Sequence, residues 1–140
     1  MQRALAGQLD YAGDGLYYLN GEPFCGICYT MKGARGRSET VFRDGLIWGT
    51  TKEWYGSGQL MREASYFKGV FHGKVQEWHK SGQLAEQGEY EYGIALWEKR
   101  WDENGQLVED FSLTEADEDY AVLQRYRSMY RSSSCSENVG

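Results

Sequence analysis

Residues 58–82 read GQLMREASYFKGVFHGKVQEWHKSG, and the segments on either side are variations on this stretch. The tetrapeptide SGQL at Ser57–Leu60 returns at Ser81–Leu84 and, as NGQL, at Asn104–Leu107. Three sets of landmarks keep a spacing of 24 residues, shortened to 23 before the last tryptophan: Gly21, Gly45, Gly69 and Gly93; Tyr18, Phe42, Tyr66 and Tyr90; Trp54, Trp78 and Trp101. A fixed period of roughly 20 to 50 residues is typical of an array of identical structural units. The sequence therefore predicts a repeat protein.

Each unit contains two short runs of alternating side chains, separated by turn-forming residues. In Leu60–Phe67, for example, Leu60, Ala64 and Tyr66 share one parity, as in a half-buried strand. Lys68-Gly69 and Ser81-Gly82 can supply the positive φ angles of reversals. A strand and its turn take too few residues for a helical crossover, so neighbouring strands should be antiparallel. We expect an all-β fold, an elongated single-layer antiparallel sheet of consecutive β-hairpins with about eight or nine strands.

The repeats are expected to occupy residues 15–113, after a lead-in at residues 1–14, with units that begin near residues 21, 45, 69 and 93. The first unit is the most degenerate, because PFCGICYT stands where later units have a strand with glycine and tryptophan. The fourth unit loses one residue before Trp101 and has Leu96 and Trp97 in place of the glycine. Terminal repeats are commonly atypical because they cap the array.

A C-terminal amphipathic helix is predicted over residues 114–131, with Thr114 as its N-cap. Acidic residues come first and arginines last, which matches the helix macrodipole. We expect its apolar stripe to cover the end of the sheet, because a bare edge strand invites aggregation. Residues 132–140 are expected to form a disordered tail.

The charge balance excludes some classes of partner. The chain has 140 residues and a net charge of −6, which argues against a nucleic-acid binder, since that would need a basic stripe. We find no secretory signal pattern and no apolar run long enough to span a membrane. We therefore expect a cytoplasmic protein that neither inserts into a membrane nor binds nucleic acid.

The cysteines and histidines offer little chemistry. Cys25 and Cys28 form a C-x-x-C pattern, but their flanks are typical of a strand, on which residues three apart point to opposite faces. We interpret them as reduced cysteines that fill strand positions. His72 and His79 lack metal-ligand spacing and are expected at the surface.

Two repeated glutamates, Glu53 and Glu77, could suggest a pair of catalytic carboxylates. Repetition should place them two strands apart, about 10 Å, where cross-strand pairing and solvation explain them. The sequence contains no nucleophile, phosphate-loop or zinc-protease motif. We therefore expect no enzymatic activity, no catalytic or metal site and no cofactor.

The aromatic side chains are the features with functional potential. We expect a structural repeat core formed by Tyr18, Phe42, Trp54, Tyr66, Trp78, Tyr90 and Trp101. A single-layer sheet has a second face that no other sheet covers, so other aromatics should be partly exposed. Exposed tyrosine and tryptophan are typical of protein-binding hot spots. The predicted partner-binding residues are Tyr29, Tyr55, Phe67, Tyr92 and Trp97.

The pattern GxxxGxxxEW(Y/H)xxGQLxxExxY resembles the MORN-repeat variant of bacterial proteins. It is present in GLIWGTTKEWYGSGQLMREASYFKG and in GVFHGKVQEWHKSGQLAEQGEYEYG, and YYLNGEPFCGICY is similar to a first unit of such proteins. The resemblance covers residues 15–113 and leaves the C-terminal helix outside it. It implies a relation to YwqK-type antitoxin or immunity proteins.

Two functions remain open at this point. In the first, the chain is a non-enzymatic antitoxin or immunity protein whose acidic, aromatic surface binds a cognate toxin domain with a basic cleft. In the second, it is a structural scaffold or a membrane-associated adaptor. The net charge of −6 disfavours attachment to an anionic membrane.

Overall fold

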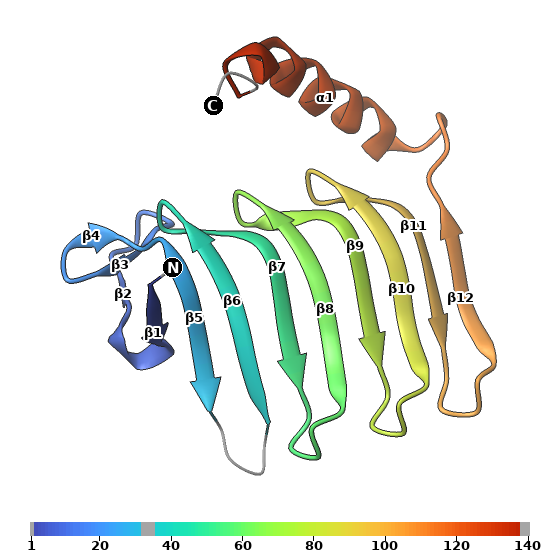
Figure 1. Ribbon diagram of the computed structural model, residues 1–140. Helices are drawn as coiled ribbons and strands as arrows, with labels where there is room; N and C mark the ends of the chain where they lie inside the picture. The colour runs from blue at the N-terminus through green and yellow to red at the C-terminus, as the bar shows by residue number, and fades with distance from the viewer. Residues whose placement is uncertain (1, 32–35, 138–140) are drawn as a thin grey trace.

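The computed structural model describes residues 2–31 and 36–137, with the backbone alone from residue 131 onward. Within these ranges the chain forms short and long strands, one turn of 3₁₀ helix and one α-helix (Figure 1). In chain order the elements are β1 Arg3–Leu5, η1 Ala6–Gln8, β2 Asp10–Tyr11, β3 Tyr17–Leu19, β4 Glu22–Pro23, β5 Gly26–Met31, β6 Arg37–Arg43, β7 Leu46–Trp54, β8 Leu60–Phe67, β9 Val70–Trp78, β10 Leu84–Glu91, β11 Ile94–Trp101, β12 Leu107–Ser112 and α1 Glu118–Glu137.

A nine-stranded sheet in the order β1-β5-β6-β7-β8-β9-β10-β11-β12 dominates the fold. From β5 to β12 every strand pairs antiparallel with the next strand in the sequence. Figure 1 shows these strands side by side in a single row. The prediction of an elongated single-layer array of consecutive hairpins is confirmed.

The N-terminal end of the array departs from the prediction in two ways. Strand β1 pairs parallel with β5, with Ala4 opposite Cys28, so the sheet is not antiparallel throughout. Strands β2, β3 and β4 form a separate three-stranded sheet, and Tyr18 therefore lies outside the main sheet. Its hydroxyl group donates a hydrogen bond to Asp14 Oδ2 at 2.5 Å, which lowers the pKa of that carboxyl group.

The degenerate first unit explains this departure. Gly26 has a φ of +152°, and a Cβ atom there would lie 2.2 Å from the carbonyl oxygen of Gln2, so only glycine lets the N-terminal segment approach β5. Ala4 and Phe24 are buried at this junction, and the Phe24 ring contacts Phe42 at a centroid distance of 5.7 Å. The main buried cluster of the molecule is thus at the N-terminal end of the sheet.

Two-residue turns join the two strands of one hairpin in the small sheet, at Asn20-Gly21, and of three successive hairpins at one end of the main sheet. In each turn both residues have positive φ, as a type I′ turn requires: Asn20 (53°) and Gly21 (85°), Asp44 (51°) and Gly45 (83°), Lys68 (49°) and Gly69 (86°), Tyr92 (50°) and Gly93 (83°). This geometry matches the twist of the flanking strands, so the 24-residue glycine period reports the hairpin turns directly.

The inner hairpins contain enlarged bulges, in which three residues stand opposite one, and a repeated glycine lies in each of them. Residues 48–50 stand opposite the single residue Val41, and residues 72–74 stand opposite Ser65. Gly49 and Gly73 sit inside these bulges with φ values of 88° and 108°. Between β10 and β11 only Leu96 is inserted, because the last unit is one residue shorter. Bulges bend a strand, and Figure 1 shows β7 and β9 turning sharply near their first residues.

The C-terminal helix differs from the prediction at both ends. The backbone and hydroxyl groups of Thr114 both donate to Asp117 Oδ2, at 2.8 and 3.2 Å, so residues 114–117 form a turn and α1 begins at Glu118. The helix ends at Glu137, so the predicted tail is helical over residues 132–137. Residues 138–140 of that tail lie outside the described residues.

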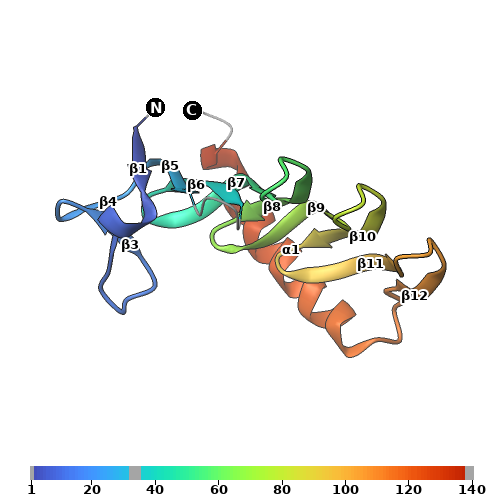
Figure 2. The same cartoon turned by 90° about the horizontal axis from the view of Figure 1, so that it is seen from below.

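The expectation that the helix covers the edge of the sheet is wrong. Helix α1 lies across the ends of the strands, beside the two-residue turns, and not along β12 (Figure 1; Figure 2). All six residues of β12 are exposed. The helix is held at the turns because tyrosines on it pack against aromatic residues there, as described below.

The bulge glycines give a test of the fold. We expect Gly73→Ala to lower the free energy of unfolding by about 2–3 kcal/mol, because it combines a positive φ with a Cβ placed 3.1 Å from Ser65 Cβ. Gly49→Ala should cost only about 1–2 kcal/mol, since Val41, 3.9 Å away, leaves room for the methyl group. Urea denaturation of both variants measures the difference, and equal losses would contradict the role of Ser65.

Candidate functional site: a charged strip across the sheet

Two of the predicted partner-binding residues lie under helix α1. Phe67 and Tyr92 have ring centroids 5.9 Å apart, and the Tyr130 ring packs against both, at 5.2 Å from Phe67 and 4.8 Å from Tyr92. The Tyr92 and Tyr130 rings are stacked, with an interplanar angle of 6°. Their main described contacts are therefore within the molecule.

A histidine and an ion pair add to these contacts at the place where α1 meets the sheet. The backbone N–H of Tyr92 donates to His72 Nδ1 at 3.0 Å, so His72 on β9, which was expected at the surface, is half-buried and bonds to the Tyr92-Gly93 turn. Arg127 donates two hydrogen bonds to the Glu91 carboxylate, at 2.7 and 2.9 Å. This pairing lowers the pKa of Glu91 and raises that of Arg127.

The other three predicted contact residues are half-buried and lie apart from one another. The Tyr29 ring lies under the guanidinium group of Arg3, 5.2 Å from its centroid. The Tyr55 hydroxyl group donates to the carbonyl oxygen of Trp78 at 2.7 Å. Trp97 is on β11, opposite Glu89 and Ser112. The structure thus brings together only Phe67 and Tyr92 from the predicted set.

Tyr55 belongs to a repeated bond between units. His79 occupies the same place one unit later, and its Nε2 lies 3.1 Å from the carbonyl oxygen of Trp101. Since a carbonyl oxygen only accepts, His79 carries its proton on Nε2. Both side chains therefore tie one SGQL-type turn to the next, and His79 is half-buried, not a free surface residue.

The predicted repeat core divides into two groups. Phe42 is buried against Phe24. Tyr66 and Tyr90 flank Phe71 at centroid distances of 5.0 and 5.1 Å, and these three rings form a continuous aromatic ladder. The tryptophans are half-buried, and within the described residues no ring contact joins Trp54, Trp78 and Trp101. Trp54 instead packs under Arg37, whose guanidinium carbon lies 4.1 Å from the ring centroid.

The same sheet face carries three parallel rows of side chains, because strand residues two apart share a face. The first row is the aromatic ladder. The second row holds small, buried residues, among them Ala64, Val75 and Gly88. The third row is charged and runs through six consecutive strands, which we call the charged strip: Glu53, Arg62, Glu77, Glu86, Arg100 and Glu109.

Ion pairs join the charged strip into two groups of three residues, which meet at Glu77 and Glu86. Arg62 lies 4.0 Å from Glu53 and 3.4 Å from Glu77. Arg100 lies 3.9 Å from Glu86 and 3.3 Å from Glu109. Each arginine therefore bridges carboxylates on both neighbouring strands. With strands about 4.8 Å apart, the strip is about 24 Å long.

The centre of the strip is less exposed and electrostatically less balanced than its ends. Burial raises the pKa of Glu86, and the adjacent Glu77 raises it further. Arg62 lies over the Phe71 ring at 4.9 Å. Its Nε atom is buried and, although Glu77 is near, has no well-aligned hydrogen bond among the described residues. Tyr90 donates a hydrogen bond to Glu98, and burial together with this bond raises the pKa of Tyr90.

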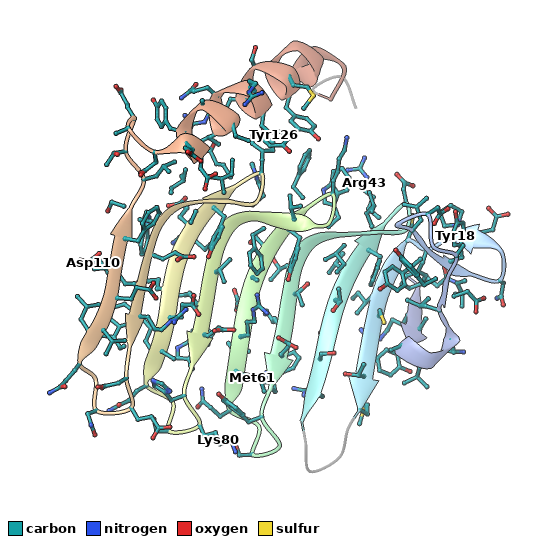
Figure 3. All side chains as sticks on the ribbon, turned by 180° about the vertical axis from the view of Figure 1, so that it is seen from behind. Tyr18, Arg43, Met61, Lys80, Asp110 and Tyr126 are labelled. Carbon is teal, nitrogen blue, oxygen red and sulfur yellow. The ribbon has the colours of Figure 1, made fainter. Side chains whose placement is uncertain are left out.

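The charged strip is accessible along its length. The side chains of Glu53, Glu77 and Glu109 are 38%, 37% and 49% exposed. Figure 3 shows the side chains standing on the strands, with α1 confined to one end of the sheet. Five of the eight charged or hydrogen-bonding residues in the strip and beside it are glutamates, so a partner meets an ordered, predominantly acidic surface: Glu53, Arg62, Glu77, Glu86, Tyr90, Glu98, Arg100 and Glu109.

Only one of the two cysteines occupies the strand position that was expected for both. Cys28 is buried on β5, and burial raises the pKa of its thiol. Cys25 is exposed just before the strand, and its sulfur accepts the backbone N–H of Asp44 at 3.1 Å. Both are free thiols. Over residues 2–31 and 36–130, where side chains are described, no group of three histidine, cysteine or acidic residues could hold a metal ion.

Sequence reasoning missed most of the charged strip, although the repeat contained the signal. Glu53 and Glu77 were identified as cross-strand partners, and the structure places Arg62 between them. The same repeat positions recur 23 or 24 residues later as Glu86, Arg100 and Glu109. Comparing charges at one repeat position across all units would have placed them in the same row.

Two segments of the chain, residues 49–68 and 71–92, match the family model described as MORN repeat variant. These two segments are similar to MORN repeats. They contain most of β7 to β10 and the Glu53–Arg62–Glu77–Glu86 part of the charged strip. The match indicates a repeat binding module. A comparison with curated proteins gives no match. Among residues 2–31 and 36–137, no helix has the length and apolar character needed to cross a membrane.

The raised pKa of Glu86 gives a signed prediction. A carboxyl group whose pKa is raised by folding stabilises the fold increasingly as the pH falls through that raised pKa. Glu86→Gln should therefore raise the free energy of unfolding at pH 7, by up to about 1 kcal/mol, and weaken the pH dependence. Glu53→Gln, which loses only an ion pair, is the control and should not stabilise. Denaturation at pH 5 and pH 8 distinguishes the two.

The Glu91–Arg127 pair predicts the opposite pH dependence, because the docking of α1 should weaken as the pH falls. Because the pKa of Glu91 is lowered, its contribution is present above the ordinary glutamate value, roughly pH 4, and is lost as the pH falls through the lowered pKa. The protection factors of the amides in residues 118–130, which correct the exchange rates for their intrinsic pH dependence, should therefore fall at low pH.

A matched pair of variants tests the same docking contact at neutral pH. Glu91→Gln should accelerate exchange in α1 at pH 7 while leaving the amides of β7 to β9 protected. Glu89→Gln, on the same strand but without an α1 contact in the described residues, is the control. Equal exchange in the two variants would show that the ion pair does not hold the helix.

Proposed function

We propose that this MORN array is an antitoxin or immunity protein that neutralises a cognate bacterial toxin through a basic surface of the toxin. The observation that carries the proposal is the charged strip, a row of carboxylates held in fixed positions on an uncovered sheet face. The net charge of −6 adds a long-range field of the same sign. A toxin that acts on a polyanion such as a nucleic acid needs a basic cleft, to which this surface is complementary.

The rigidity of the surface supports this role. The glutamates of the strip are bridged by Arg62 and Arg100, and the row of small residues beside them is buried. Side chains that are already ordered lose less conformational entropy when a partner binds. The aromatic ladder, on the same face beyond the row of small residues, adds large, rigid contact area, which favours tight binding.

Tyr29, Tyr55 and Trp97 stay predicted contacts for the same partner, and Phe67 and Tyr92 would join them only where α1 leaves their rings exposed. The non-enzymatic character of the chain and its cytoplasmic location are part of the proposal. The scaffold or membrane-adaptor alternative predicts a different ligand, an anionic lipid surface, which the acidic strip would repel.

Affinity capture followed by a growth assay tests the proposal. The protein is used as bait in its native host, and each captured protein is expressed alone and together with the bait in a surrogate host. We expect a basic partner that stops growth alone and is harmless when co-expressed. Glu53→Gln combined with Glu77→Gln should weaken this rescue, whereas Glu115→Gln combined with Glu118→Gln, which changes the net charge equally, should not.

The association rate provides a second, independent readout. It should fall about tenfold or more between about 50 and 500 mM salt, because steering by exposed charges is screened over this range. A captured partner that is not toxic, a rate that ignores salt, or binding to vesicles of anionic lipid in place of a protein would each reject the antitoxin role.

A further inference from the structure

Strand β12 is the outermost strand of the nine-stranded sheet, and its outer edge has no partner strand among residues 2–31 and 36–137. Its apolar residues are unusually open, with Leu107, Val108 and Phe111 exposed by 49%, 59% and 36%. The chain leaves β12 toward the turn end of the sheet, where α1 begins, so the helix does not cover this edge (Figure 1).

The backbone of β12 is ready to accept another strand. The N–H of Leu113 donates to the carbonyl oxygen of Leu96 at 2.8 Å, and the register from Glu109 to Ser112 is regular. In an antiparallel pair, alternate residues direct their backbone groups to opposite sides. Glu109 and Phe111 therefore bond to β11 with Leu113, while Asp110 and Ser112 direct their N–H and carbonyl groups outward. An exposed edge of this kind is a template for strand addition.

The side chains of β12 define the charge of the strand that fits. Along the charged strip each arginine has a carboxylate on both sides, and Glu109 has Arg100 on its inner side only. On the opposite face Asp110 stands opposite Lys99, again on the inner side only. A strand added outside β12 would bring side chains to about 5 Å from both carboxylates. Basic residues at these two places continue the alternation of charge.

The same charges disfavour pairing with a second copy of the chain. Two copies of β12 related by a two-fold axis, with nearly full overlap, would place Glu109 opposite Glu109 or Asp110 opposite Asp110, because opposite residues of an antiparallel pair lie on the same face of the sheet. Like charges directly opposite each other destabilise a strand pair. Strand β12 is six residues long and contains no proline or lysine. Its edge is therefore open to a strand of different sequence, whereas its two acidic residues disfavour pairing with a second copy of β12.

We propose that β12 binds an extended segment of a partner protein as a tenth strand, with lysine or arginine opposite Glu109 and Asp110 and with apolar residues beside Leu107 and Phe111. This inference deepens the proposed function, and rests on it only in assigning the segment to the same basic partner. The added strand would extend the charged strip by one rung and join the partner to the array through backbone hydrogen bonds.

A peptide assay with the whole protein tests the strand addition directly. The probe is a labelled eight-residue peptide of alternating valine and threonine with Arg-Lys at its centre, and the comparison peptide has Glu-Glu there. Fluorescence anisotropy should show at least about tenfold tighter binding of the basic peptide. Hydrogen exchange should slow at the amides of Asp110 and Ser112 and stay unchanged in β6 to β8.

Two matched pairs of variants make the result specific. Ser112→Pro removes one outward donor without removing a bond to β11, so it should weaken the peptide about tenfold or more, whereas Ser112→Ala should not. Glu109→Lys with Asp110→Lys should reverse the preference toward the acidic peptide. Glu115→Lys with Glu118→Lys changes the net charge equally and should keep the original preference. Equal responses to the two double variants would show unspecific attraction and overturn the inference.

The assay needs no cellular partner, so its failure is separable from failure of the proposed function. No peptide binding, together with rescue that still depends on Glu53 and Glu77, would reject strand addition and leave the antitoxin role standing. Peptide binding without any toxic partner would do the reverse. A wild-type dimer that Ser112→Pro dissociates would show that a second copy occupies the edge, which also overturns the inference.

Discussion

The architecture depends on a two-residue turn in which both residues have positive φ angles. This turn recurs at Asp44-Gly45, Lys68-Gly69 and Tyr92-Gly93, each at the same point of a 24-residue unit. It forces the chain back antiparallel after every unit and keeps the strands in one register. Because register is preserved, residues at one repeat position fall in one row across the sheet. The aromatic ladder, the buried row and the charged strip all follow from that constraint.

A row of this kind gives a surface whose charges are ordered by the backbone and not by chance packing. Arg62 and Arg100 occupy non-equivalent repeat positions, yet both lie between carboxylates on neighbouring strands. The exception is the contact of Glu77 with Glu86, where like charges meet and the pKa of Glu86 is raised. The strip therefore stores an electrostatic imbalance at its centre, where burial is also greatest. A basic partner group placed there would relieve it.

The sequence predicts the middle of the fold well and its two ends poorly. The inner hairpins were predictable because the local signals, Lys68-Gly69 and the bulge glycine Gly73, act within a few residues. The parallel pairing of β1 was not predictable, because it depends on the close approach of Gln2 to Gly26. No pattern in the sequence indicates that contact. The helix was predicted from its periodicity, but its docking place depends on rings at Phe67 and Tyr92, which looked like exposed contact residues.

The site was predictable only in part for a similar reason. Partial exposure of aromatics follows from a single-layer sheet, but which of them meet depends on the path of α1 after β12. The pairing of Glu53 with a cation was a local, cross-strand matter and could be anticipated. Glu109 and Asp110 form an exposed acidic edge only because α1 lies across the strand ends and leaves β12 uncovered.

The parallel contact between β1 and β5 has a consequence for how the chain folds. From β5 to β12 each strand pairs with its immediate neighbour in sequence, so any inner hairpin can nucleate and the array can grow from it in either direction. Strand β1 must instead close a longer loop, with Ala4 reaching Cys28, and α1 must return across 36 residues for Arg127 to reach Glu91. Closing a loop of this length costs more conformational entropy than adding the next strand to a hairpin. We therefore expect the two ends of the molecule to order after the repeats between them.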